Sequence, residues 1–197
     1  MRLAPDNIDR IFTAMEKQIS LRTAERVEIV VCGGTALAML DLVARTTKDV
    51  DVLAWARDTG GLVELERIHG FPDWLEESAL VVARDFGLPS GWFNSVPASQ
   101  LDLGLPDGFE SRLSKRQYGD QLTVYLTGRR DQIFFKLFAA VDRNDYHTQD
   151  LRALAPTEAE LADAARWVVT QDVSDPFLMV LKDFLVRHGY ATVASQL

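Results

Sequence analysis

The chain has 197 residues, of which 47% are hydrophobic and 25% are charged, as in an ordinary folded protein rather than a disordered one. Its formal net charge of −8 argues against a protein whose main role is to coat DNA or RNA, because non-specific affinity for nucleic acid comes from basic side chains that neutralise phosphates. A small nucleotide stays compatible with this charge, since a divalent metal ion can mediate its binding.

We expect a cytoplasmic protein that does not cross a membrane. The single cysteine, Cys32, excludes an intramolecular disulfide and fits a reducing compartment. The opening stretch MRLAPDNIDR lacks the apolar middle of a signal peptide. No apolar run approaches the roughly 20 residues that a transmembrane helix needs.

Residues 1–128 are predicted to form an α/β part, from apolar spacing and turn residues. The expected elements, in chain order, are an amphipathic helix capped by Asp6 or Asn7, a buried strand at 27–32, a helix at 35–44, a strand at 48–54, a short helix within 58–70, a helix at 73–86 capped by Asp73, a long irregular segment, and strands at 110–118 and 122–126.

Residues 129–197 are predicted to be helical and to pack on the first part. The expected helices begin at Asp131, near His147, after a capping box formed by Thr157 and Glu160, and at Ser174, and a last turn lies at 190–197. The sequence therefore predicts two domains, 1–128 and 129–197.

Gly33, Gly34 and Thr35 lie between the strand at 27–32 and the helix that follows. Backbone N–H groups at a helix start attract phosphate, and glycines let the backbone come close to an anion. Thr35 would add a hydroxyl donor. The alternative is that the two glycines serve only a tight turn, so this motif by itself is a weak signal.

Asp49 and Asp51 occupy alternate positions of the next predicted strand, so both carboxylates should project from one face. Two such carboxylates on an apolar strand repel each other unless a cation lies between them. Mg²⁺ is bound by one or two carboxylates together with substrate phosphates. The alternative is an edge strand with a solvated polar face.

The segments GGTALAML and RTTKDVDVL, taken together, resemble the nucleotidyltransferase fold of the polymerase-beta superfamily. They look most like the branch that contains the AbiEii-type toxins, in which an Arg and a Thr or Ser precede the Asp-x-Asp, as Arg45 and Thr47 do here. The resemblance continues into the segment IFFKLFAAVDRNDYHTQDL, where Lys136, Arg143 and the pair Asp150-Leu151 match family positions.

The resemblance implies an α+β fold, with a small mixed sheet flanked by helices and followed by a C-terminal helical part. It also implies a Mg²⁺-dependent enzyme that moves a nucleoside monophosphate from a nucleoside triphosphate to an RNA or protein hydroxyl, in a toxin–antitoxin or phage-defence system with a cognate antitoxin. The residues would divide into phosphate-binding Gly33, Gly34, Thr35 and Arg45, metal-binding Asp49 and Asp51, and Lys136, which would neutralise developing charge.

Two residues outside the glycine turn have open roles. A lysine beside an apolar helix face, such as Lys136, is usually a surface residue whose stem lies along apolar atoms. With the two aspartates nearby it would instead act as a phosphate-binding charge. Asp150 is a surface charge, a partner of Arg143 or a site residue.

Active superfamily members usually carry a third carboxylate on a later strand, and here only Asp102, in the irregular segment, is a candidate. A catalytically inactive module that binds nucleotide or a partner protein is therefore the second hypothesis. A third is an unrelated α/β protein in which the glycine pair and the Asp-x-Asp occur by chance.

Overall fold

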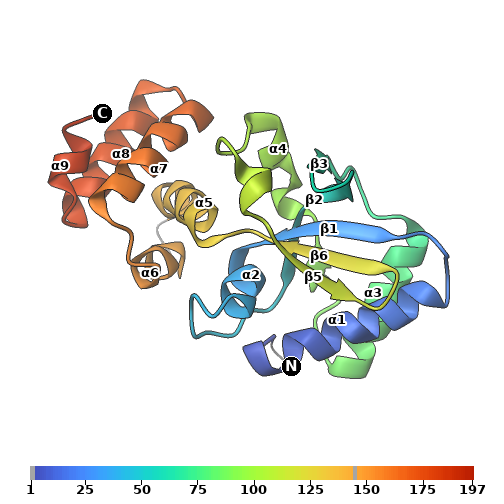
Figure 1. Ribbon diagram of the computed structural model, residues 1–197. Coiled ribbons are helices and arrows are strands. Elements are labelled where there is room, and N and C mark those ends of the chain that lie inside the picture. The colour runs from blue at the N-terminus through green and yellow to red at the C-terminus, as the bar shows by residue number, and fades with distance from the viewer. Residues whose placement is uncertain (1–2, 144–145) are drawn as a thin grey trace. The chain divides into compact units, whose positions relative to one another are not determined.

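The computed structural model describes residues 3–143 and 146–197. The chain divides into two compact units, Met1–Gly128 and Arg129–Leu197 (Figure 1). That these units are separate domains stays a prediction. In the described part of the chain, every helix is too short or too polar to cross a bilayer.

The first unit mixes helices and strands, which confirms the predicted α+β fold class. Its elements are α1 (Pro5–Ser20), β1 (Val27–Cys32), α2 (Gly33–Met39), β2 (Val50–Asp58), β3 (Val63–Glu66), α3 (Asp73–Phe86), β4 (Phe93–Asn94), the short helical turns η1 (Val96–Ser99), α4 (Gln100–Leu103) and η2 (Phe109–Arg112), and the strands β5 (Ser114–Tyr118) and β6 (Leu122–Leu126).

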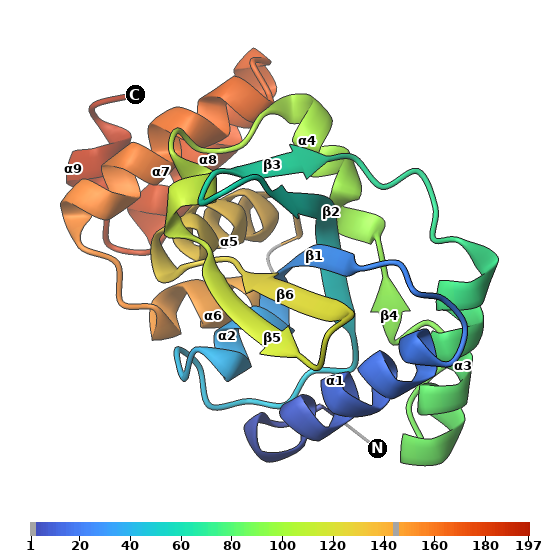
Figure 2. The ribbon, with the colours of Figure 1, turned by 45° about the vertical axis from the view of Figure 1, so that its right-hand side comes forward.

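The strands form one mixed sheet in the order β3-β2-β1-β6-β5, with β4 paired to β2 (Figure 2). β1 is antiparallel to β2 and parallel to β6. The register between β1 and β2 shifts at Val30 and Val31. Because of this irregularity Asp51 and Trp55, although four positions apart on β2, project from opposite faces of the sheet.

The hydrophobic core lies where α1 and α3 pack against the sheet. The apolar stripe predicted for the first helix is confirmed in full, because all its members are buried: Ile8, Ile11, Phe12, Met15 and Ile19. Burying a side chain of this size contributes roughly 1.5–3 kcal/mol relative to leaving it exposed. These contacts fix α1 against the sheet.

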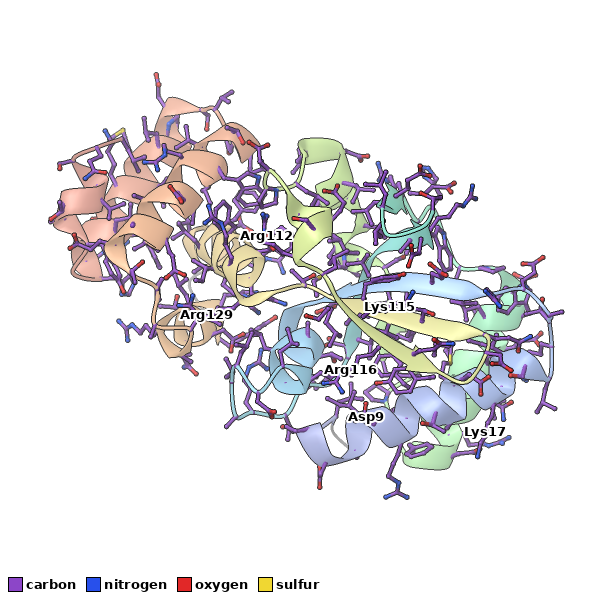
Figure 3. All side chains as sticks on the ribbon, in the orientation of Figure 1. Asp9, Lys17, Arg112, Lys115, Arg116 and Arg129 are labelled. Carbon is purple, nitrogen blue, oxygen red and sulfur yellow. The ribbon has the colours of Figure 1, made fainter. Side chains whose placement is uncertain are left out.

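A polar contact also joins α1 to β5. The Tyr118 hydroxyl donates a hydrogen bond to the carboxylate of Asp9, which Figure 3 places on α1. Burial, together with this carboxylate, raises the pKa of Tyr118 above its usual range. Both effects favour the neutral form of the tyrosine, which donates the hydrogen bond.

Several predicted bounds are wrong in detail. Residues 58–70 do not contain a helix: β2 continues to Asp58, and β3 follows a turn in which Gly60 and Gly61 both have positive φ. The helix predicted at 35–44 begins at Gly33 and ends at Met39, because Asp41 adopts a left-handed conformation.

The predicted caps and one strand start also shift. Ala4 takes the N-cap position of α1 because Pro5 occupies the first helical position, where its missing N–H costs nothing. Pro72, not Asp73, caps α3. The strand expected from residue 110 starts at Ser114, after the turn η2.

The second unit is helical, as predicted. Its elements are α5 (Arg129–Arg143), α6 (Tyr146–Ala153), α7 (Glu158–Gln171), α8 (Asp175–Arg187) and α9 (Ala191–Ala194). The capping box before α7 is confirmed: the Glu160 N–H donates to Thr157 Oγ1 at 3.2 Å, and the Thr157 N–H donates to Glu160 Oε2 at 2.9 Å. Each bond satisfies a backbone donor that the helix start would leave unpaired.

Candidate functional site

The carboxylate of Asp51 packs against the turn that leads from β1 into α2. Asp51 is the cross-strand partner of Cys32, the last residue of β1. Gly33 has a φ of +66°, and a Cβ added to it would lie 2.6 Å from Asp51 Oδ2. Only glycine accepts both this conformation and this approach. The structure therefore brings the first residue of the glycine turn and the second aspartate into direct contact.

Gly34 is packed against the segment that precedes β2. A Cβ at Gly34 would lie 2.8 Å from Thr47 Oγ1 and 3.2 Å from Arg45 Nη2. Thr47 is itself fixed by two backbone hydrogen bonds of 2.9 Å with Leu3. Arg45 and Thr47, both expected at the site, therefore lie at the glycine turn.

Asp49 directly precedes β2, so the prediction that it shares this strand with Asp51 is wrong, and hydrogen bonds hold it from two sides instead. Its carboxylate oxygen Oδ1 accepts a hydrogen bond from Thr47 Oγ1 at 3.0 Å, and its backbone carbonyl accepts one from Thr35 Oγ1 at 2.7 Å. Thr35 is fully buried, so its hydroxyl ties α2 to the backbone of Asp49. This contact gives Thr35 a positioning role that the sequence did not indicate.

Asn94 was not predicted as a site residue, yet it lies beside Asp51. β4 runs parallel to β2 with Asn94 opposite Asp51, and Asn94 Nδ2 donates to Asp51 Oδ1 at 3.3 Å and to the Val50 carbonyl at 3.4 Å. Asn94 Oδ1 accepts the Val96 N–H at 3.0 Å, which fixes the orientation of the amide. A two-residue strand inside an irregular segment leaves no periodic pattern, so no sequence signal indicates this pairing.

Asp102, the candidate third carboxylate, forms an ion pair with Arg67, and its side chain is about half exposed. Within residues 3–143 and 146–197, no three or more His, Cys, Asp or Glu side chains are grouped to hold a metal ion. The donor set next to the glycine turn is thus Asp49 and Asp51. Two carboxylates suit a Mg²⁺ ion that takes its other ligands from substrate phosphates and water, and they fall short of an all-protein metal cage.

In the second unit, Lys136 is buried and paired. Its Nζ lies 2.8 Å from Asp150 Oδ2 and 3.4 Å from His147 Nδ1, and the side chains of Lys136 and Asp150 are 5% and 1% exposed. Lys136 is therefore not a solvated surface lysine. Asp150 is its partner, whereas Arg143 pairs with Asp142 on the surface.

A family model described as "Nucleotidyltransferase of unknown function (DUF6036)" matches residues 7–158, which is most of the chain. The matched range includes the glycine turn, both aspartates and the Lys136–Asp150 pair. No curated protein and no solved structure was found to match the chain. The likeness to the AbiEii branch stays a prediction.

Proposed function

The chain belongs to this family of nucleotidyltransferases, and we propose that it binds a nucleoside triphosphate with Mg²⁺ and transfers the nucleoside monophosphate to a hydroxyl group of an RNA or a protein. One observation carries the proposal: Asp51 lies against Gly33 while Asp49 is tied through Thr47 to Gly34. Two carboxylates are thus anchored on one glycine turn, where a metal–phosphate complex needs them.

The residues of the turn hold and orient the substrate. The Gly33-Gly34 backbone leaves no side chain between an incoming phosphate and the two aspartates. Arg45, whose guanidinium lies beside Gly34, supplies positive charge for the phosphates. Thr35 and Thr47 keep Asp49 in place. Bound Mg²⁺ would neutralise phosphate charge as the transfer proceeds.

The transfer itself exchanges one phosphorus–oxygen bond for another. The acceptor oxygen bonds to the α-phosphorus, the bond from that phosphorus to the pyrophosphate oxygen breaks, and pyrophosphate leaves with the electron pair. The proton of the acceptor hydroxyl passes to a carboxylate or to water. Asn94 cannot take this proton, because an amide is not a base at neutral pH, so Asp49 and Asp51 are the carboxylates that we assign to this task.

For Lys136 we keep, as a proposal, the role that the resemblance implies, which is to balance phosphate charge during transfer. Its amine is buried and held 2.8 Å from Asp150, so Asp150 acts as its positioning residue. Lys136→Met removes the charge and should abolish transfer. Asp150→Asn keeps the lysine and should lower the rate without abolishing it.

The test is transfer from α-³²P-labelled triphosphates, each of the four in turn, to total bacterial RNA and to the chain itself in the presence of Mg²⁺. The proposal expects labelled product with the natural chain and with Asp107→Asn, an exposed aspartate of the same unit that serves as the matched control. It expects none with Asp49→Asn or Asp51→Asn. Equal labelling by all four proteins would contradict the assignment of the site.

A toxin role, which the likeness to AbiEii-type proteins supports, is tested by expression. Induced expression of the chain in a bacterial host should arrest growth, and Asp51→Asn should relieve the arrest. Normal growth with a protein that is active in the transfer assay would rule out this setting while leaving the chemistry intact.

The second candidate function is a nucleotide-binding module without catalysis, and one observation favours it. Asn94, not a carboxylate, lies next to Asp51, and Asp102 is engaged by Arg67. Calorimetric binding of a non-hydrolysable triphosphate with Mg²⁺, combined with the transfer assay, separates the two. Binding that Asp51→Asn abolishes, with no transfer by the natural chain, would establish the module.

A further inference from the structure

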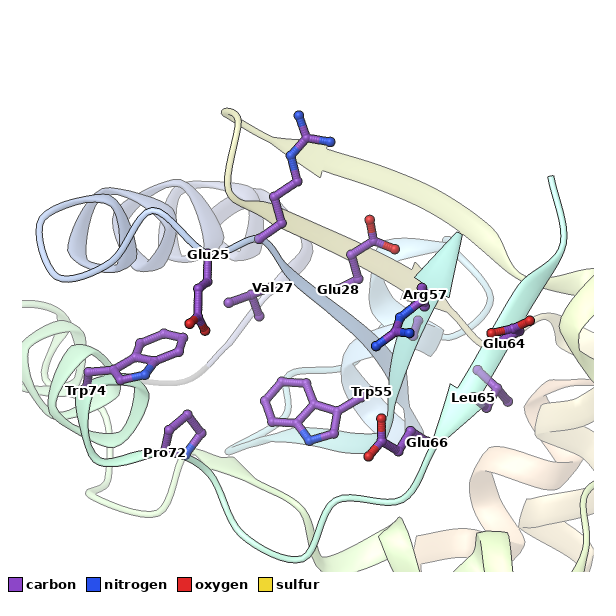
Figure 4. A pocket seen from close by; sticks show the side chains of 12 residues that line it. Glu25, Val27, Glu28, Trp55, Arg57, Glu64, Leu65, Glu66, Pro72 and Trp74 are labelled. Atoms are coloured by element: carbon purple, nitrogen blue, oxygen red, sulfur yellow. The ribbon is translucent and has the colours of Figure 1, made fainter. Parts of the chain in front are cut away.

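A cavity of about 640 Å³ opens in the first unit, lined by residues of four segments: the start of β1, the end of β2, the strand β3 and the start of α3. Figure 4 shows the indoles of Trp55 and Trp74 facing this space, with Pro72 at its base and the carboxylates of Glu25 and Glu66 at its edge. Its volume falls within the range that organic ligands and side chains fill.

This cavity is distinct from the glycine turn. Asp51 is paired with Cys32 and Trp55 with Ile29, and paired residues project from the same face of a sheet. Cys32 and Ile29 are three positions apart on β1, so they point to opposite faces. Trp55 therefore opens onto the face away from Asp51. The separation along β1 adds roughly 10 Å at about 3.3 Å per residue.

The lining combines aromatic faces with acidic groups. Four glutamates and two arginines contribute to it, so its formal charge is negative. Arg57 is the cross-strand partner of Glu64, so residues of opposite charge are neighbours there. Glu28 accepts the Asp58 N–H at 3.1 Å.

Glu25 and Glu66 are the two acidic groups that a ligand would meet. Within the described residues, neither carboxylate has an ion-pair or hydrogen-bond partner. Glu66 is the cross-strand partner of Trp55, and Glu25 lines the same cavity as Trp74. Each indole therefore has a glutamate in the same cavity lining, Glu66 for Trp55 and Glu25 for Trp74.

An indole face attracts ammonium and guanidinium groups, and a nearby carboxylate adds charge-assisted hydrogen bonds. The apolar side chains of Val27 and Pro72, which also line the cavity, suit the methylene stems of lysine and arginine. Two tryptophans and two unpaired glutamates, carried by separate elements, match two cationic side chains on one chain. A net charge of −8 also favours the approach of a basic partner.

We propose that this cavity binds a short basic segment of a partner protein, through two cationic side chains that meet Trp55 with Glu66 and Trp74 with Glu25. The inference is independent of nucleotide transfer, because the cavity and the glycine turn share no residue and Trp55 and Asp51 project from opposite faces of the sheet.

The test is isothermal titration calorimetry of the full chain with an acetylated and amidated Gly-Arg-Gly-Arg-Gly peptide at low salt. The double variant Glu25→Gln/Glu66→Gln, which removes charge from exposed positions without changing shape, should raise the Kd roughly tenfold. Trp74→Leu should weaken binding as well. Binding should also fall steeply as salt is added.

The matched control is Glu76→Gln. Glu76 is exposed on α3 and lies two residues beyond Trp74, about 200° around the helix, so it does not line the cavity. This variant changes the net charge of the same unit and should leave the Kd unchanged.

Three outcomes would overturn the proposal. The first is no binding of the arginine peptide to the natural chain. The second is an equal loss of affinity in Glu76→Gln and the double variant, which would indicate a general charge effect. The third is binding of putrescine as tight as that of the peptide, which would assign the cavity to a free diamine.

Discussion

Gly33→Ala perturbs the candidate site at the point where the turn meets the aspartate. The added Cβ would lie 2.6 Å from Asp51 Oδ2, a separation that side-chain carbons do not adopt, so the carboxylate must move. The φ of +66° costs a residue with a Cβ roughly 1–2 kcal/mol in addition. We expect the Kd for a non-hydrolysable triphosphate with Mg²⁺ to rise roughly tenfold or more, a loss of about 1.4 kcal/mol, when measured by calorimetry.

Gly60→Ala separates the two effects. Gly60 has a φ of +81° and no atom within 4 Å of the Cβ position, so this variant bears the same backbone cost without touching the site. Both variants should lose thermal stability through the backbone cost, with a larger loss in Gly33→Ala because of its contact with Asp51, and only Gly33→Ala should lose affinity. Unchanged affinity in Gly33→Ala, with a folded protein by circular dichroism, would refute the role of the turn in holding Asp51 for the metal–phosphate complex.

Three further predictions concern stability and metal response. Lys136→Met leaves the charge of Asp150 buried and should lower the free energy of unfolding by roughly 3–5 kcal/mol in urea titrations. The double variant Lys136→Met/Asp150→Leu should recover most of this loss, and equal losses in both variants would contradict a coupled pair. Asn94→Asp places a carboxylate next to that of Asp51, so the Tm should fall without Mg²⁺ and recover when Mg²⁺ is added. A Tm that does not change when Mg²⁺ is added would argue against a metal position beside Asp51. The guanidinium of Arg129 and the Thr157 N–H lower the pKa of Glu160 to about 2, so the contribution of Glu160 to the stability of the fold is complete above the ordinary glutamate pKa and is lost as the pH falls toward 2. The difference in the free energy of unfolding between the natural chain and Glu160→Gln should therefore be full at pH 7 and shrink below about pH 4. A difference that stays constant with pH would contradict this linkage.

Local patterns predicted the elements whose burial follows one clear period. The stripe from Ile8 to Ile19 specifies α1, and the apolar run from Val27 to Cys32 specifies β1. The helix expected near Leu62 was wrong. The i, i+3 spacing of Leu62, Leu65 and Ile68 suggested a helix, but the two adjacent glycines before it form a turn between strands. The positive φ angles of Gly60 and Gly61 form the turn that places β3 beside β2.

The contacts between distant segments could not be predicted in the same way. The sequence indicated Gly33, Gly34 and Asp51 because a helix start and a strand position obey local rules. It also indicated Asp49, but as a strand residue, whereas the strand starts one residue later, at Val50. Asn94 was not predicted as a site residue, because it contacts Asp51, 43 positions away in the sequence, from a strand of only two residues.

The partner of Lys136 was likewise left open. The sequence offered three roles for Asp150, and only the packing of α6 against α5 brings the two buried side chains together. The periodicity of apolar residues along α5 does not indicate which residue of α6 a given side chain of α5 contacts.

The most direct test of the central claim is calorimetric titration of the full chain with a non-hydrolysable nucleoside triphosphate, with and without Mg²⁺, for the natural sequence and for Asp51→Asn. We predict binding that requires Mg²⁺ and that Asp51→Asn abolishes, with Asp107→Asn binding normally. Triphosphate binding of equal strength in Asp51→Asn, or in the absence of Mg²⁺, would contradict a site built on the glycine turn and its two aspartates.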